Sequence, residues 1–530
     1  MALRVYVTVL LLLVGAGALA DSGCLDDKAP GVDRFHAQSW GIDERNTRYQ
    51  PRSTIASGNV PTLELAWVYG LASTTPRSLP LVSDDTVFVG DGPRGVVALD
   101  RASGCERWLS PHSGSIASAL VPASAGNRPL LVYNDRTQGI YALDARTGEP
   151  VWRTGMDDLP LAWYSGTPLP IGDTLYAPIS SFEVALAMNP FYGCCTTRGG
   201  LAAFDLETGA RRWFLPTIDE PAKRTGSHWV FVDEYGPSGA AVWGAPSYDA
   251  KRQWLYFGTG QNYSHPTTAT SDAIFAVDAA TGTVQWHRQF TANDAYTAAC
   301  NNIELNHPNC PKPTGPDVDF GAPTLLVTAP SGRQLLIAGQ KSAEVHAMDP
   351  ATGTVLWSKR LGRGGIIGGV HWGMAANEAL GLLYVPISDK EIEGFPAPGT
   401  PAPGLYALDI ETGEERWVYT RPSRCPDTEC VFGLSAAVSA ANDVVVVGSM
   451  DGMLEVLHAA TGERLWSHDA WRDYAAVNGV ATSGGAFDTH GALLVDDLLM
   501  VVAGYGYVGR QRGGNALLVF RVRSPGPTDE

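Results

Sequence analysis

Short apolar runs separated by turn residues recur along almost the whole chain. Thr86-Val87-Phe88-Val89 is followed by Gly95-Val96-Val97, and Val444-Val445-Val446-Val447 is followed by Leu454-Glu455-Val456 in the same way. Runs of this length, rich in β-branched and aromatic residues and bounded by Gly or Asp, are typical of β-strands. Helical periodicity never extends beyond a turn or two. The pattern therefore predicts an all-β protein.

The apolar runs lead into a repeated motif, Ala-x-Asp-x-x-Thr-Gly-x-x-x-Trp, which occurs seven times with small variations. In this motif Asp accepts turn amides, Gly supplies a positive φ, and Trp docks between neighbouring units. An equivalent strand context near the start adds an eighth unit. The eight tryptophans are Trp67, Trp108, Trp152, Trp213, Trp286, Trp357, Trp417 and Trp466. Eight such units predict an eight-bladed β-propeller with four strands in each blade.

The repeat also gives expectations about strand order and domain organisation. We expect each Trp to open the first strand of the next sheet, and the strand at 515–522 to complete the blade begun by Trp466. Loops are longest between Trp152 and Trp417, so the middle blades should carry the elaborated face. Residues 21–530 are expected to form a single propeller domain.

The first residues have the pattern of an export signal. Arg4 precedes an apolar run from Val5 to Leu13, and Ala18-Leu19-Ala20 provides a small-residue cleavage site. We expect residues 1–20 to be a signal peptide and the mature protein to be periplasmic or secreted. The alternative is a membrane anchor, for which the apolar run is short, and no later segment is long and apolar enough to span a membrane.

Export permits disulfide bonds, and the chain contains eight cysteines. None begins a C-x-x-C-H motif, so no covalent c-type haem is expected. The adjacent Cys194 and Cys195 are either two unrelated thiols or a strained ring of the kind that marks functional sites. The other candidate pairs are the local Cys300/Cys310 and Cys425/Cys430 and the long-range Cys24/Cys105.

Composition and charge limit the classes of partner. The chain has 38 Lys and Arg against 55 Asp and Glu, which gives a formal net charge of −17. This balance argues against a nucleic-acid surface, which needs a dense cationic stripe, and suits neutral or cationic partners. An apolar fraction of 45% with only 18% charged residues excludes a disordered chain.

Four clusters outside the repeat contain side chains that could bind a ligand or take part in catalysis. Carboxylate and amide oxygens suit a hard cation such as Ca²⁺, Lys and Arg suit an anionic ligand, and a Trp face suits a flat aromatic ligand. Together they indicate a planar acidic cofactor beside a metal ion. Taken singly, each also has a structural explanation, such as a turn, a core residue or a solvated loop. The clusters are Glu183 with Cys194, Cys195 and Arg198; Trp243 with Gln261; Asp317 and Asp319 with Lys341; and His371-Trp372 with Asn478.

From about Trp40 to Val522 the chain resembles the quinoprotein alcohol dehydrogenases of the polyvinyl-alcohol-dehydrogenase type. Non-catalytic propellers of the outer-membrane assembly type share the Trp repeat, so the other motifs are the more specific ones. Besides the repeat, the resemblance is carried by Trp40-Gly41, Asn46-Thr47-Arg48-Tyr49, Cys194-Cys195-Thr196-Thr197-Arg198-Gly199, Gly315-Pro316-Asp317-Val318-Asp319-Phe320-Gly321, Gly339-Gln340-Lys341 and Val477-Asn478-Gly479.

The resemblance implies pyrroloquinoline quinone (PQQ) in the central channel, with Ca²⁺ or, alternatively, a lanthanide beside it. It implies that Trp243 forms the floor under the quinone and that a Cys194–Cys195 disulfide covers the opposite face. Lys341 would bond the quinone oxygens, Arg198 would pair with a cofactor carboxylate, and Asn478 would belong to the same site. The implied metal ligands are Glu183, Gln261, Asp317 and Asp319, and Asp317 is also the implied catalytic base.

The resulting expectation is an exported PQQ-dependent enzyme that oxidises a primary or secondary alcohol, with polyvinyl alcohol or another polyol as a candidate substrate. Electrons would pass to a separate acceptor such as cytochrome c. Two alternatives remain: a non-catalytic propeller scaffold, and an enzyme of the same fold that acts on a sugar or small polyol. Two departures from the family pattern are Gln261, which is longer than the usual Asn, and Arg77, which stands where related enzymes have a cofactor-binding Glu.

Overall fold

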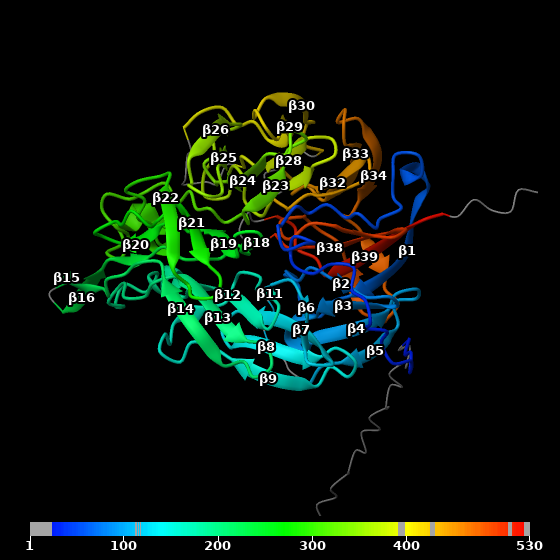
Figure 1. Cartoon of the computed structure of the whole chain (residues 1–530), viewed down its shortest axis with the longest axis horizontal. Helices are drawn as coiled ribbons and strands as arrows, with labels where there is room; N and C mark the ends of the chain where they lie inside the picture. Colours follow the sequence, from blue (N-terminus) through cyan, green and yellow to red (C-terminus); the bar gives the residue numbers. More distant parts are fainter. Residues whose placement is uncertain are drawn as a thin grey trace, which may run out of the picture.

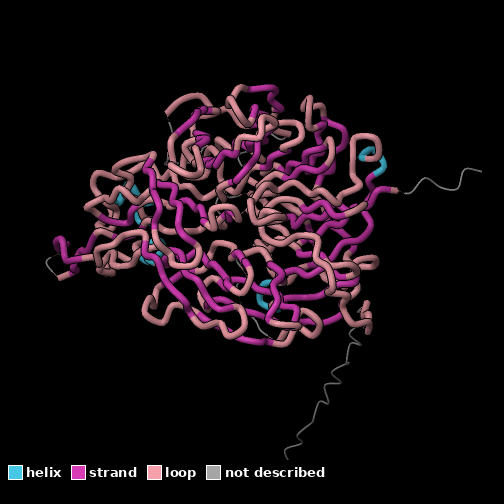
Figure 2. The backbone as a smooth tube through the Cα atoms, in the orientation of Figure 1, coloured by secondary structure: helices cyan, strands magenta, loops and turns pink. Residues whose placement is uncertain are grey.

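The structure is a computed structural model, and its regular elements are almost all β-strands (Figures 1 and 2). It describes residues 24–523 except 112–113, 115, 117, 230, 391–397, 425–429 and 507–510. The expected signal peptide and Cys425 of the expected Cys425/Cys430 pair therefore lie outside the described residues. No helix in the described ranges has the length and apolar character needed to cross a bilayer.

Eight antiparallel sheets form a ring and confirm the predicted eight-bladed propeller (Figure 1). In blades 1 to 7 the chain runs from the innermost to the outermost strand. Blade 1 contains β2 (Leu81–Val82), β3 (Thr86–Gly90), β4 (Val96–Asp100) and β5 (Glu106–Leu109), and blade 2 contains β6 (Val121–Ala125), β7 (Arg128–Asp135), β8 (Gly139–Asp144) and β9 (Pro150–Thr154). Blade 3 contains β11 (Leu169–Ile171), β12 (Thr174–Ser181), β13 (Gly200–Asp205) and β14 (Arg211–Pro216), with β10 (Ala162–Trp163) also paired to β12.

The remaining blades repeat this arrangement, except that the last takes its outer strand from the N-terminal part of the chain. Blade 4 contains β18 (Ser247–Asp249), β19 (Trp254–Gly258), β21 (Ala273–Asp278) and β22 (Val284–Gln289), and blade 5 contains β23 (Leu325–Thr328), β24 (Gln334–Gly339), β25 (Glu344–Met348) and β26 (Val355–Arg360). Blade 6 contains β27 (Ala375–Asn377), β28 (Leu382–Ile387), β29 (Gly404–Asp409) and β30 (Glu415–Tyr419), and blade 7 contains β31 (Ser439–Ala441), β32 (Val444–Gly448), β33 (Met453–His458) and β34 (Arg464–Asp469). Blade 8 contains β37 (Leu493–Val495), β38 (Leu498–Ala503), β39 (Ala516–Val522) and β1 (Leu63–Gly70).

Short hairpins and helices are inserted between these strands. Most of them fall between residues 183 and 305, within the stretch expected to carry the elaborated face. They are α1 (Glu183–Leu186), the hairpin of β15 (Lys223–His228) and β16 (Val232–Gly236), the pair β17 (Ser238–Gly239) and β20 (Asn262–Ser264), and the 3-10 helix η3 (Ala298–Leu305). The others are η1 (Val60–Thr62), η2 (Gly92–Arg94) and the pair β35 (Asp473–Ala475) and β36 (Ala481–Ser483).

The ring is closed by the two ends of the propeller sequence. Leu63 of β1 lies opposite Val522 of β39, and Gly70 lies opposite Ala516. The expectation that 515–522 completes the blade of Trp466 is therefore wrong, because Trp466 lies on β34 at the outside of blade 7. The N-terminal strand covers the edge that β39 would otherwise expose, and closure removes an unpaired sheet edge.

Each Trp strand also belongs to the same sheet as the Ala-x-Asp strand before it, not to the next sheet. Ala98 of β4 lies opposite Trp108 of β5, for example, because the Asp-to-Gly turn is a tight hairpin. The indole instead reaches across to the neighbouring blade. Trp357 packs under Gly413, where an added Cβ would lie 2.7 Å from its ring, and its Nε1 donates to the Ile410 carbonyl at 3.1 Å. Docking of Trp between units is thus confirmed.

The segment before the first blade ties the inner strands together. Arg48 is fully buried, lies 4.4 Å from the centre of the Trp40 ring and donates to the carbonyls of Val438 and His490. The Asn46 amide donates to carbonyls of blades 4 and 5. Because these acceptors belong to different blades, this segment fixes the blades around the site.

Candidate active site

Lys341 follows β24 and joins two buried carboxylates. Its Nζ donates to Asp317 Oδ1 at 2.9 Å and to Asp319 Oδ2 at 3.3 Å. Burial opposes the positive charge of Lys341, but the two carboxylates outweigh burial and raise the pKa of its ammonium group. Lys341 is therefore charged and holds the carboxylates on either side of it.

The backbone at Asp317 adopts a left-handed conformation, with φ of 56°, that non-glycine residues seldom occupy. The carboxylate of Asp294 accepts hydrogen bonds from the backbone nitrogens of Asp317 at 3.1 Å and Val318 at 3.0 Å, which holds this turn in place. Burial raises the pKa of Asp317 to about 7, with Lys341 acting in the opposite direction. Sequence reasoning missed Asp294, because a loop aspartate that binds backbone amides has no distinguishing local motif.

Asp319 brings Trp243 and Gln261 to the same place. Its Oδ2 accepts from Trp243 Nε1 at 3.2 Å, and its Oδ1 accepts from the Gln261 backbone nitrogen at 2.9 Å. The Trp243 ring lies against Gly321, where an added Cβ would come within 1.8 Å of it. Five of the predicted site residues, Trp243, Gln261, Asp317, Asp319 and Lys341, therefore converge from blades 4 and 5.

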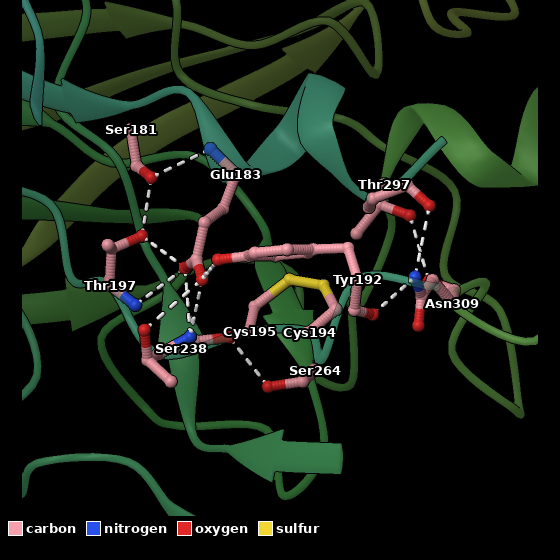
Figure 3. Close-up of a disulfide and its surroundings, with 12 residues drawn as sticks. Ser181, Glu183, Tyr192, Cys194, Cys195, Thr197, Ser238, Ser264, Thr297 and Asn309 are labelled. Atoms are coloured by element: carbon pink, nitrogen blue, oxygen red, sulfur yellow. Dashed lines mark hydrogen bonds between the residues drawn. A yellow bond between two sulfur atoms is a disulfide. The ribbon is translucent and has the colours of Figure 1, made fainter. Parts of the chain in front are cut away.

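Glu183 lies in a second group, at the first residue of α1 (Figure 3). Its carboxylate is fully buried and accepts hydrogen bonds from the backbone nitrogens of Thr196 at 2.9 Å and Thr197 at 2.6 Å, and from the Tyr192 hydroxyl. Tyr263 packs with Cys194 and Cys195 beside the second group, in a cluster against which Trp243 of the first group packs. Burial raises the pKa of Tyr263, and the charges of Asp319 and Glu183 add to this effect. The four predicted metal ligands are thus divided between two groups, and no three acidic, His or Cys side chains in the described ranges form a metal cluster.

Cys194 and Cys195 form a disulfide beside Glu183, as the resemblance implied (Figure 3). The pair packs in one cluster with Ala241 and Tyr263, and Trp243 packs against that cluster. The alternative of two separate thiols is wrong. The pairs Cys24–Cys105 and Cys300–Cys310 also form disulfides, in agreement with the sequence-based candidates.

Two predicted cofactor-binding residues have other contacts. The Arg198 guanidinium donates to the carbonyls of Ile218 at 2.8 Å and Asp219 at 2.7 Å. The Asn478 amide pairs with both backbone groups of Gly70 and so holds the end of β1. In the described part of the chain, neither side chain contacts the group around Lys341.

Two other arginines form no ion pair among the described residues. The Arg77 guanidinium lies 4.7 Å from the centre of the Trp372 ring and 5.4 Å from that of Tyr505, and Trp372 meets Trp243 edge to face at 6.1 Å. Arg136 lies 5.1 Å from the Trp163 ring. Burial lowers the pKa of Arg77 and the charge of Arg136 adds to this effect, whereas Tyr505 and Asp488 act in the opposite direction.

The buried Nε atoms of Arg77 and Arg136 have no hydrogen-bond partner among the described residues, and neither side chain forms an ion pair there. Two cations beside aromatic rings, without such an ion pair, favour a planar anionic ligand. Sequence reasoning missed Arg136, because Asp135-Arg136-Thr137 looks like an ordinary solvated turn between β7 and β8. For Arg77 the signal was its departure from the expected Glu.

A hollow of about 650 Å³ lies next to the turn that carries Asp317. Its lining includes Tyr296, Pro316, Val318 and Ser342, together with residues of the Cys300–Cys310 loop. Pro316 and Val318 flank Asp317 in sequence, and Ser342 follows Lys341. The hollow provides space for a small organic molecule beside these groups.

Comparison with known proteins identifies the family. The model for the glucose/ethanol/alcohol dehydrogenase β-propeller domain, named for PQQ, matches residues 37–299, and the model for the outer membrane protein assembly factor BamB matches residues 270–523. A polyvinylalcohol dehydrogenase of a Sphingopyxis strain is 31% identical over 90% of this chain and 74% of its own length. A second, from a Pseudomonas species, is 33% identical over 91% of this chain and 76% of its own length.

The chain belongs to the PQQ-dependent alcohol dehydrogenase family, in its polyvinyl-alcohol-dehydrogenase type. The family assignment and the enzyme class predicted from the sequence are thereby confirmed. A solved structure of a quinohemoprotein alcohol dehydrogenase from Pseudomonas putida covers 93% of the chain, and the chain covers 82% of it, with a TM-score of 0.65 at 20% identity. At that identity the structural likeness shows the quinoprotein dehydrogenase fold.

Proposed function

We propose that this quinoprotein oxidises hydroxyl groups of polyvinyl alcohol or a similar polyol, with PQQ bound among Trp243, Lys341, Arg77 and Arg136. The observation that supports this most directly is that Arg77 and Arg136 lie beside aromatic rings and form no ion pair among the described residues. PQQ is a planar quinone with carboxylate substituents, so an aromatic wall and unpaired cations fit its chemistry. The substitution of Glu by Arg at position 77 then supplies positive charge to the cofactor site.

The other residues fit the same group by their chemistry. Trp243 packs against the cluster that contains the Cys194–Cys195 disulfide. The indole and the disulfide both provide apolar faces for a flat ring. Lys341 is a buried cation that can donate to a quinone oxygen. Arg198 is a less favourable partner for a cofactor carboxylate than Arg77, because its guanidinium is already bonded to two backbone carbonyls.

When bound, PQQ supplies the acceptor for the hydride that leaves the carbinol carbon. Asp317 is proposed to accept the hydroxyl proton at its carboxylate, as a general base. Lys341 fixes one oxygen of that carboxylate, and Asp294 fixes the backbone turn that presents it. Because Asp317 is only 6% exposed, the same packing limits the access of water to the proton-accepting group.

We propose Ca²⁺ as the metal, with a lanthanide as the alternative. The candidate ligands are carboxylate or amide groups, which are the oxygen donors that a hard cation prefers. They are Glu183, Gln261, Asp317 and Asp319. Because these ligands are separated into two groups, metal loading is a necessary part of the functional test.

Export to the periplasm and transfer of electrons to a separate cytochrome c complete the proposal. The formal net charge of −17 would attract a basic redox protein over long distances. Electron transfer to a basic cytochrome should therefore slow as the salt concentration rises, since screening weakens attraction between exposed charges.

The deciding experiment measures cofactor binding and turnover on the same preparation. Purified protein is titrated with PQQ, with Ca²⁺ or a lanthanide present, and binding is followed by absorbance. Dye-linked oxidation is then measured with polyvinyl alcohol, a short secondary diol and glucose. We expect saturable PQQ binding and turnover of the polymer and the diol. PQQ binding without turnover of any alcohol or sugar would contradict the proposed activity, and no PQQ binding would favour the scaffold alternative.

A further inference from the structure

The β15–β16 hairpin projects at the outer edge of the ring (Figure 1). Exposed aromatic side chains cluster at this hairpin: Phe191, Trp229 and Phe231 are 67%, 48% and 71% exposed, and we call them the aromatic platform. The rings of Phe191 and Trp229 are 5.3 Å apart, and those of Trp229 and Phe231 are 6.4 Å apart. Clustered exposed aromatic residues on a soluble protein mark a binding surface.

Two ion pairs lie near the platform. Arg224 bonds Asp233 at 2.7 Å, and Lys223 bonds Glu220 at 2.8 Å. Glu234 lies 3.2 Å from His228. The platform side chains themselves are uncharged and apolar, so an uncharged chain with apolar segments matches them.

A cleft of about 550 Å³ lies beside the platform. His228, which meets Trp229 edge to face at 5.3 Å, lies in its wall, and so do Tyr263 and Cys194. Asn306, Cys310 and Lys312 line both this cleft and the hollow beside the turn that carries Asp317. The platform, the cleft and the hollow therefore adjoin one another, and we call this series the track.

The walls of the track are held in place by hydrogen bonds. His228 Nε2 lies 2.9 Å from the Pro190 carbonyl, which joins the hairpin to the turn that carries Phe191. The Asn309 amide donates to the carbonyls of Asn189 and Tyr192, both at 3.0 Å, so the Cys300–Cys310 loop is fixed to the same turn (Figure 3). A surface that is already ordered loses less entropy when it binds a flexible chain.

We propose that the aromatic platform and the cleft form a binding subsite for a long uncharged polymer of alternating CH₂ and CHOH groups. The aromatic faces cover its apolar edge, while the track guides a segment to the hollow beside Asp317. A short alcohol fills only the hollow and does not reach the platform. This inference rests on the polyol substrate of the proposed function, and it adds where the part of the polymer outside the hollow binds.

The test compares wild type with the triple variant Phe191→Ala, Trp229→Ala, Phe231→Ala. Leu380→Ala, which removes a 43% exposed apolar side chain between β27 and β28, is the matched control. For the triple variant we expect KM for high-molecular-weight polyvinyl alcohol to rise about tenfold or more, the scale of losing several aromatic contacts at a binding surface. KM for pentane-2,4-diol, and kcat for both substrates, should stay within about twofold of wild type. The control should match wild type for both substrates.

Binding to the cofactor-free protein gives a second readout that does not depend on turnover. Polyvinyl alcohol should be retained by wild type in equilibrium dialysis and lost by the triple variant, with the melting temperature unchanged. An unchanged polymer KM, or polymer binding unaffected by the substitutions, would overturn the subsite. So would lipid-vesicle binding that the variant loses while polymer binding remains. If no alcohol is oxidised at all, the proposed function fails, and the dialysis result still decides the subsite.

Discussion

Most buried indole N–H groups at the outer rim of this propeller have hydrogen-bond partners, whereas several buried charged groups in its channel do not. At the rim, seven of the eight repeat tryptophans donate their indole N–H to a carbonyl of the neighbouring blade, and Trp108 is the exception. In the channel, Arg77 and Arg136 form no ion pair, and both buried carboxylate oxygens of Asp272 have no partner, among the described residues.

This difference separates stability from function. Satisfied, repeated contacts at the rim stabilise the ring, whereas unpaired charge near the axis costs stability and is retained where a ligand supplies the missing partner. Changes in the channel should therefore impair activity or cofactor binding with little loss of stability. Changes at the rim should do the reverse.

The largest effect is expected for Asp317→Asn, which keeps the shape of the side chain and removes the proposed base. Turnover with a short secondary alcohol should fall about 10²-fold or more, the scale of a general-base contribution. PQQ affinity, measured by titration, should change much less. The control is Asp349→Asn in a rim turn, where only stability should respond. Unchanged turnover in Asp317→Asn would remove Asp317 from the mechanism.

Replacing the unpaired arginines should weaken cofactor binding without unfolding the protein. For Arg77→Met and Arg136→Met we expect the Kd for PQQ to rise about 10-fold or more each, since each loses one charge-assisted contact. The melting temperature of the cofactor-free variants should be unchanged or higher, because a buried unpaired charge is removed. Arg128→Met, at the exposed start of β7 in blade 2, is the comparison, and equal PQQ affinity in all three variants would refute this assignment.

At the rim, Gly413→Ala should reduce stability and leave turnover intact. Its φ is 72°, within the 67° to 77° of the equivalent turn glycines, and a Cβ would lie 2.7 Å from the Trp357 ring. We expect a loss of about 2–4 kcal/mol in the free energy of unfolding, measured with denaturant. Gly332→Ala has φ of 86° and no atom within 4 Å of the added Cβ, so it isolates the backbone cost. Equal losses in the two variants would show that Trp docking contributes nothing.

The smallest effect concerns pH. His346 is 3% exposed, its ring lies 4.1 Å from that of Phe290, and burial lowers its pKa to about 4. Because this folded-state pKa lies below the ordinary value of 6.5, the neutral ring stabilises the fold fully above pH 6.5, and the contribution is lost as pH falls toward 4. Between pH 7 and 5, the free energy of unfolding of His346→Gln, measured with denaturant, should therefore fall by about 1–2 kcal/mol less than that of wild type. A pH dependence of stability in His346→Gln identical to that of wild type would contradict this prediction.

The same division between rim and channel explains how far the sequence could be interpreted. The rim motif repeats, so blade number and Trp docking could be predicted from eight copies of one pattern. Strand order could not, because a Trp after a turn fits either the same sheet or the next. The convergence of Trp243, Asp317, Asp319 and Lys341 followed from family motifs, whereas Arg136 and Asp294 depend on contacts between segments far apart in sequence.

The pairing of β1 with β39 has a consequence for how the chain is made. As the polypeptide leaves the ribosome, β1 emerges before the strands of the other blades and must remain without its partner until β39 has been synthesised. The ring therefore cannot seal before β39 is available. The two ends of the propeller also lie side by side, so a circularly permuted gene that begins at β2 and places β1 after β39 would retain every blade and form blade 8 from consecutive strands.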